Sequence, residues 1–150
     1  MAFPSTARSL NPAMTQAQID RLFGRIRGIC LALPEAKEVA AWGHPTFRAP
    51  KKMFAACGTD KDGTASLGLK VGFDRQEELL EDARFFPTLY AAHQGWVSLR
   101  LRPRMDWAGL TALLVEAYRQ VAAKRLLKQL DSDGRLAACI GGSAADSRLK

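Results

Sequence analysis

Residues 96–102 alternate strictly between aliphatic and other side chains, and this pattern constrains the fold more than any other feature of the chain. In an extended segment, successive residues face opposite sides. One side of this segment is aliphatic, and the other carries an aromatic ring, a hydroxyl and two guanidinium groups: Val97, Leu99 and Leu101 against Trp96, Ser98, Arg100 and Arg102. The pattern predicts a half-buried strand, in a sheet with one covered face and one open face.

A long amphipathic helix is predicted over residues 15–33. Thr15 and Gln18 have the spacing of a capping box, in which each side chain satisfies a free backbone N–H of the other residue. The apolar residues that follow recur at three- and four-residue spacing and make one stripe: Ile19, Leu22, Phe23, Ile26, Ile29, Cys30 and Leu33. Pro34 disfavours helical geometry at the residue before it, so the helix is expected to end there.

Short antiparallel strands are predicted between residues 46 and 71, with a turn at residues 59–63, whose sequence is TDKDG. The last of these strands alternates again, with two sets of side chains on opposite faces: Leu67, Leu69 and Val71 toward the core, and Ser66, Gly68 and Lys70 toward the open side. The open face of the sheet is therefore expected to carry basic residues from more than one strand.

Two further helices are predicted. Asp74 and Glu77 form a second capping signature, for a short acidic helix that must finish before Pro87. Asp106 is expected to cap a last helix, whose apolar residues recur at helical spacing. From residue 131 onward the chain is rich in Gly, Ala, Ser and Asp without periodicity, so a loose tail is expected over residues 131–150.

The predicted order is one helix, three strands, one helix, two strands and one helix. Each helix has one apolar stripe and each strand one apolar face, which favours an α+β two-layer sandwich, an antiparallel sheet with helices on one face. A chain of 150 residues has about the length of one domain. We expect a flexible N-terminal segment over residues 1–14, a single domain over residues 15–130, and then the tail.

Composition narrows the class of protein. Hydrophobic residues make up 47% of the chain and charged residues 25%, values typical of a globular protein. No apolar run approaches the roughly 20 residues of a membrane span, and the N-terminus lacks the pattern of a signal peptide, so a cytoplasmic monomer is expected. Three widely separated cysteines match no metal-ligand spacing, and Cys30 and Cys57 are interpreted as small core residues.

Two motifs carry a resemblance to a known family. Residues 42–48 read WGHPTFR and residues 52–55 read KMFA. They resemble the W-G-x-P-x-F motif, followed by K or R, and the K-M-F-A motif of the MmcQ/YjbR family. Residues 66–70, 87–96 and 118–124 resemble further segments of that family in the expected order, with Gly68 and Leu69 inserted before the lysine of the family's S-L-K strand. The resemblance implies a CyaY-like or secretion-chaperone-like fold, and DNA binding through a double-wing arrangement.

A basic surface is the main candidate site. The residues expected to bind nucleic acid lie on or beside the open sheet face, and Lys51 adjoins them: Arg48, Lys52, Lys70, Trp96, Arg100 and Arg102. Positive groups attract phosphates, and an aromatic ring among them stacks on a base. The alternative is that the arginines keep the sheet soluble and discourage edge pairing, and that Trp96 packs beneath a neighbouring segment.

Catalysis is not expected. The chain has two histidines, His44 and His93, with no carboxylate or cysteine at a recognisable metal spacing, so no metal or cofactor is expected. Residues 60–63 resemble the start of a calcium loop, but Val71 stands where the loop's glutamate belongs.

Two other functions remain open. The same face would suit a protein or peptide, because aromatic residues and Arg are enriched at binding hot spots. A small molecule would need a pocket, for which Trp42, His44 and Phe47 are the candidates.

Overall fold

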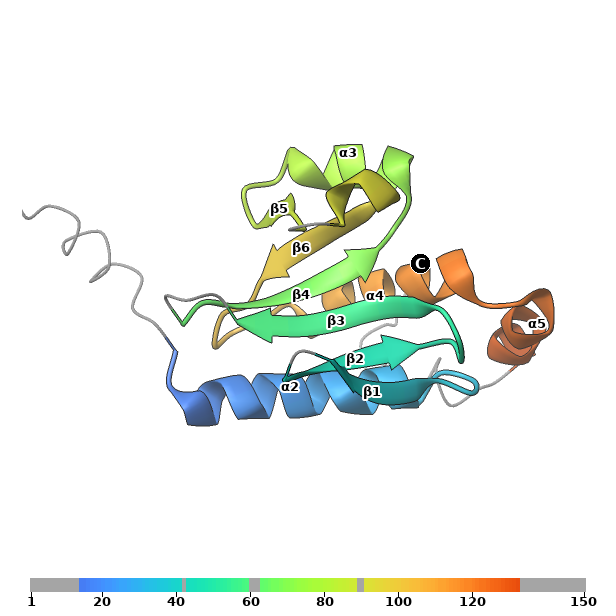
Figure 1. Ribbon diagram of the computed structural model, residues 1–150, viewed down its shortest axis with the longest axis horizontal. Coiled ribbons are helices and arrows are strands. Elements are labelled where there is room, and N and C mark those ends of the chain that lie inside the picture. Colours follow the sequence, from blue (N-terminus) through green and yellow to red (C-terminus); the bar gives the residue numbers. More distant parts are fainter. Residues whose placement is uncertain (1–13, 42, 60–62, 89–90, 133–150) are drawn as a thin grey trace, which may run out of the picture.

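The computed structural model describes residues 14–41, 43–59, 63–88 and 91–132. Within these ranges the chain forms a six-stranded antiparallel sheet, in the order β1-β2-β3-β4-β6-β5, with helices packed on it (Figure 1). The strands are β1 (Lys37–Ala41), β2 (His44–Arg48), β3 (Met53–Thr59), β4 (Ala65–Lys70), β5 (Phe85–Pro87) and β6 (Trp96–Arg100). The helices are α2 (Gln16–Leu31), α3 (Phe73–Leu80), α4 (Trp107–Val121) and α5 (Lys124–Ser132), and a short 3-10 turn, η1, covers Ala92–Gln94.

The predicted α+β class and two-layer arrangement are confirmed. Helix α2 packs on β1 and β2, α4 packs on β3 and β4, and α3 packs on β5 and β6. The structure adds two elements to the predicted order. Strand β1 extends the sheet at one edge, and the predicted last helix divides at Ala122, whose ψ of 146° is extended. The division redirects α5 so that Leu126 and Leu130 enter the core.

The predicted helix starts are confirmed at two of three positions. The Thr15 hydroxyl accepts from the Gln18 amide at 3.1 Å, and the Gln18 side chain accepts from the Thr15 amide at 2.9 Å. Asp106 caps α4 by accepting from the Gly109 amide at 3.1 Å. The prediction of a cap at Asp74 is wrong. Helix α3 is preceded by Gly72, whose φ of +88° suits glycine, so Asp74 falls inside the first turn.

The core lies between the sheet and the helices. Leu67, Leu69 and Val97 face it from β4 and β6 and are fully buried, as the alternation predicts. Cys30 and Cys57 also lie in this core as free thiols. Burial raises the pKa of Cys57 to about 12 and raises that of Cys30 well above its ordinary value. Neither thiol is therefore ionised at neutral pH.

The face of the sheet away from these helices is more covered at β6 than the alternation predicts. Trp96 is only 7% exposed and Ser98 only 5%. Strand β5 pairs with β6 and brings Phe86 opposite Ser98. The Thr88 hydroxyl lies 2.9 Å from the Ser98 hydroxyl. Strand β5 and Thr88 therefore lie beside this face, and a concave surface forms where an open one is expected.

Candidate nucleic-acid interface

A groove of about 880 Å³ occupies this concave face. Its floor consists of small side chains on three adjacent strands, where Ala56 pairs with Gly68 and Gly68 pairs with Ser98. Gly58 and Ser66 pair in the next row. Larger side chains rise around the floor: Met53, Phe86, Trp96 and Val121. The groove is hollow because the residues at its centre are the smallest on the sheet.

Trp96 forms one wall of the groove. A methyl group placed on Gly68 would lie 3.5 Å from Cε3 of the indole, so the ring lies across the glycine at van der Waals distance. The amide of the Gln76 side chain donates to the carbonyl oxygens of Ala92 and Trp96, at 2.7 and 2.8 Å. These two bonds hold η1 against the start of β6, and so they fix the indole in its position.

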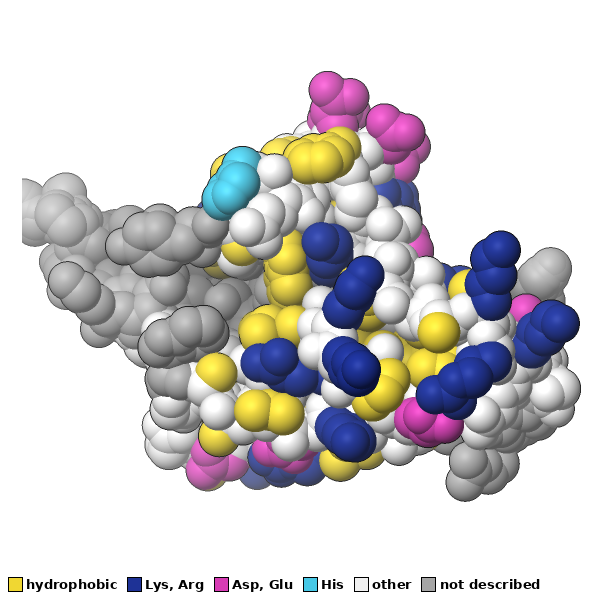
Figure 2. Space-filling model, turned by 45° about the vertical axis from the view of Figure 1, so that its right-hand side comes forward, with side chains coloured by type: hydrophobic (Ala, Val, Ile, Leu, Met, Phe, Trp, Pro, Cys, Tyr) yellow, Lys and Arg dark blue, Asp and Glu magenta, His cyan; other side chains and the backbone are white. Residues whose placement is uncertain are grey.

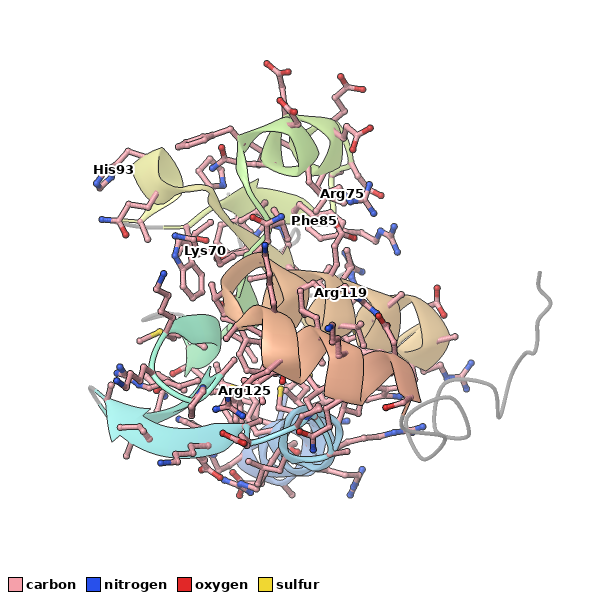
Figure 3. All side chains as sticks on the ribbon, turned by 90° about the vertical axis from the view of Figure 1, so that its right-hand side faces the viewer. Lys70, Arg75, Phe85, His93, Arg119 and Arg125 are labelled. Atoms are coloured by element: carbon pink, nitrogen blue, oxygen red, sulfur yellow. The ribbon has the colours of Figure 1, made fainter. Side chains whose placement is uncertain are left out.

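One end of the groove is strongly basic. We call its four cationic residues the basic rim: Arg48, Lys51, Lys52 and Lys70. Figure 2 shows Lys and Arg side chains gathered on this side of the molecule with hydrophobic side chains between them, and Figure 3 shows Lys70 on the side away from α4. Among the described residues, no Asp or Glu lines the groove. The positive charge is therefore not neutralised locally.

Arg48 supports this interpretation. Its Nε is buried and has no hydrogen-bond partner in the described part of the chain. One terminal nitrogen donates to the Lys51 carbonyl oxygen at 3.5 Å, which is long for a hydrogen bond. A buried donor without an acceptor is uncommon in folded proteins and indicates a group that a ligand or water satisfies.

Many of the other arginines are held in ion pairs. Arg27 pairs with Glu38 at 2.6 Å, and Arg125 pairs with Glu35 at 2.7 Å. The hydrogen bond from each arginine is the main cause that lowers the pKa of its glutamate partner. Three further pairs join Arg75 to Glu116, Arg84 to Asp82 and Arg119 to Asp131. Bonds from Arg84 lower the pKa of Asp82 to about 2. The basic rim differs from these arginines in having no carboxylate partner in the described residues.

The structure separates the six residues predicted to bind nucleic acid. Four of them line the groove: Arg48, Lys52, Lys70 and Trp96. Arg100 lies beside it, with its guanidinium carbon 4.6 Å from the centre of the Phe86 ring. Arg100 and Arg102 line a different cavity, on the α4 side. Arg102 lies beyond the end of β6 at Arg100, and neither arginine lines the groove.

Among the described residues, the candidates for a ligand pocket do not lie together. Phe47 is fully buried in the core, so its assignment to a pocket is corrected. His44 lines a separate hollow beside α2, together with Asp20 and Arg27. Trp42 lies outside the described residues. The physical reason is the alternation of side chains along β2, which places Phe47 in the core and its neighbour Arg48 beside the groove.

Two of the apolar residues that line the groove, Met53 and Phe86, were not identified from the sequence. Met53 pairs with Arg48 across the same irregularity, whereas its neighbour Phe54 is fully buried. Phe86 follows the buried Phe85 in a strand of three residues, too short for alternation to be recognised. Their positions depend on strand pairing.

In the described ranges, no three His, Cys, Asp or Glu side chains gather closely enough to hold a metal ion. The helices that the structure describes are all too short or too polar to span a bilayer.

Comparison with known proteins gives one family and one fold. A family model described as YjbR matches residues 31–120. The crystal structure of Deinococcus radiodurans protein DR2400, with family-model domain DUF419, is similar at a TM-score of 0.56 and 24% identity. The similarity covers 71% of this chain and 85% of that one. No curated protein matches the chain.

Proposed function

The chain belongs to the YjbR family, and we propose that it is a non-enzymatic module that binds single-stranded nucleic acid weakly in the groove. The observation that carries the proposal is the basic rim, four cationic side chains at one end of a concave surface that no described carboxylate lines. Phosphates of a nucleic-acid backbone would lie along this rim, because neutralising them releases the counterions condensed on the strand.

The walls of the groove favour a single strand over a duplex. Met53, Phe86, Trp96 and Val121 give the groove an apolar side that a phosphate backbone alone would not use. Unpaired bases have exposed faces that pack on aromatic and apolar side chains, whereas the bases of a duplex are stacked on one another. Trp96 is too covered to stack freely, so its contribution is the shape of the wall and not an open platform.

The test is a salt series. Fluorescence anisotropy with a labelled single-stranded oligonucleotide would follow log affinity against log salt concentration. Four phosphates neutralised on a single strand predict a slope of about −2.8. The variant Lys51→Gln/Lys52→Gln removes two of the four cations, so its slope is expected near −1.4 and its binding weaker at low salt.

A matched control removes the same charge elsewhere. Arg102→Gln/Arg104→Gln also lowers the net charge by two, but both side chains are exposed and lie outside the groove. The control is expected to keep the unmodified slope. Equal losses in the two variants would mean that net charge alone governs binding, and the proposal would then be wrong.

An acidic peptide is the second candidate, because the same rim and apolar wall would suit carboxylates beside apolar side chains. A poly-glutamate chain with the same number of charges as the oligonucleotide separates the two. Tighter binding of the oligonucleotide supports the contact with bases. Equal or tighter binding of poly-glutamate would contradict it.

A further inference from the structure

A second cavity, of about 330 Å³, lies between α3, α4 and the end of β6. Its position is separate from the groove, since the two have no described lining residue in common. Figure 3 shows Arg75 and Phe85, which both line it, toward the α4 side, and Lys70 of the basic rim on the other side. Five arginines from three parts of the fold line this cavity: Arg75, Arg84, Arg100, Arg102 and Arg104.

Two of these arginines are neutralised within the protein. Arg75 donates to Glu116 at 2.9 Å and contacts Glu78 at 3.4 Å, and Arg84 pairs with Asp82 at 2.7 Å. These bonds fix the two guanidinium groups at the side of the cavity.

The two acidic side chains that line the cavity also have partners within the protein. Glu116 is the partner of Arg75, and Asp106 accepts the hydrogen bond that caps α4. In contrast, Arg100, Arg102 and Arg104 form no ion pair with any described residue. Three positive charges therefore line a cavity in which Asp106 is the one lining carboxylate without an ion pair among the described residues.

The inner surface of the cavity is apolar. Phe85, Leu99 and Leu110 are buried core residues that line it, and so do Leu79, Met105 and Leu113. A volume of 330 Å³ would hold about eleven waters at roughly 30 Å³ each, which lies at the small end of ligand pockets. A ligand that fits combines a compact apolar part with more than one negative charge.

We propose that this cavity binds a small organic molecule that carries two or more linked phosphate groups. Guanidinium groups present planar pairs of N–H donors that match phosphate oxygens, and they stay charged at all physiological pH values. Linked phosphates place several charges within a few ångströms, which suits three arginines in one cavity. The proposal is independent of the function assigned to the groove.

Isothermal titration calorimetry with inorganic pyrophosphate and with a nucleoside triphosphate tests the proposal. Both probes are expected to bind the unmodified chain, and the nucleoside triphosphate is expected to bind more tightly because its organic part reaches the apolar lining. The variant Arg102→Gln/Arg104→Gln is expected to bind both probes at least tenfold more weakly. Its side chains are exposed, so circular dichroism and the melting temperature are expected to stay unchanged.

The groove variant Lys51→Gln/Lys52→Gln is the matched control, with the same loss of charge. It is expected to bind pyrophosphate within twofold of the unmodified chain. The proposal is overturned if pyrophosphate does not bind, or if both variants lose it equally. It is also overturned if Arg102→Gln/Arg104→Gln weakens oligonucleotide binding but not pyrophosphate binding, because the arginines would then belong to the polynucleotide surface.

Discussion

The hydroxyl of Tyr118 in α4 donates a hydrogen bond of 2.6 Å to the backbone carbonyl oxygen of Pro34, 84 residues earlier in the chain. Both residues are buried, and the Tyr118 ring packs edge-on against Phe54 with the ring centres 5.5 Å apart. Tyr118→Phe keeps the ring and removes only the donor. The Pro34 carbonyl oxygen would then lose the partner that the structure gives it.

The cost of this change follows from the burial of the acceptor. A buried carbonyl without its donor costs about 1–3 kcal/mol of unfolding free energy. At about 2 kcal/mol, a chain of this size would melt some 4–8 °C lower. Urea unfolding followed by circular dichroism measures the free energy, and an unchanged slope against urea would show that the folded state is intact. A loss below about 0.5 kcal/mol would refute the reasoning.

The pH dependence of stability tests the burial of the Tyr118 phenol. Burial is the main cause that raises the pKa of Tyr118 to about 12, from about 10 for an exposed phenol. The neutral phenol is therefore favoured in the folded state. Its contribution to stability is complete below pH 10 and is lost as the pH rises through 12. The gap between the unmodified chain and Tyr118→Phe is expected to narrow over that range, and a constant gap would contradict the assignment.

Three further predictions concern stability and thiol reactivity. Asp106→Ala removes the cap of α4 and is expected to cost about 0.5–2 kcal/mol of unfolding free energy. Asp106→Asn keeps a capping oxygen and should retain most of that stability. Equal losses in the two variants would exclude capping as the cause. Gly72→Ala is expected to destabilise by about 1–2 kcal/mol, since φ is +88° and the new methyl would lie 3.1 Å from the Gln120 side chain. In Gly24→Ala, in α2, the new methyl meets nothing within 4 Å and should stabilise the fold by about 0.5–1 kcal/mol. A change of the same sign in the unfolding free energy of Gly72→Ala and Gly24→Ala would contradict the structure. In a Cys139→Ser chain, Cys30 and Cys57 are expected to react with a disulfide reagent only after denaturant is added, because burial raises both thiol pKa values. Rapid labelling of the native protein would be inconsistent with the buried positions of these two thiols.

Side-chain alternation predicted the orientation of β4 and β6 correctly. A strand with one covered face repeats every two residues, so the sequence itself shows which side is buried. Strand β1 was not predicted, because it lies at the edge of the sheet and four of its five residues are exposed. Such a strand is fixed by backbone pairing with β2, and its composition carries no apolar face to recognise.

The candidate site was predicted only in part. The basic residues on β2 and β4 were identified, since their positions follow from the local pattern. The irregular pairing that sets Met53 opposite Arg48 depends on β3, and no local pattern within β2 encodes it. Arg100 and Arg102 were expected beside the groove residues, yet both line the cavity on the α4 side. That cavity is built by β5, β6 and α4 together, so the pattern of β6 alone does not encode it.

An NMR titration of the isotope-labelled chain with a short single-stranded oligonucleotide tests the central claim most directly. We expect amide shifts concentrated around the groove, at Lys51, Lys52, Gly68, Lys70 and Ser98, with the α4 side near Arg104 unchanged. Shifts confined to the α4 side, or no shifts at low salt, would contradict the assignment of the groove as the nucleic-acid interface.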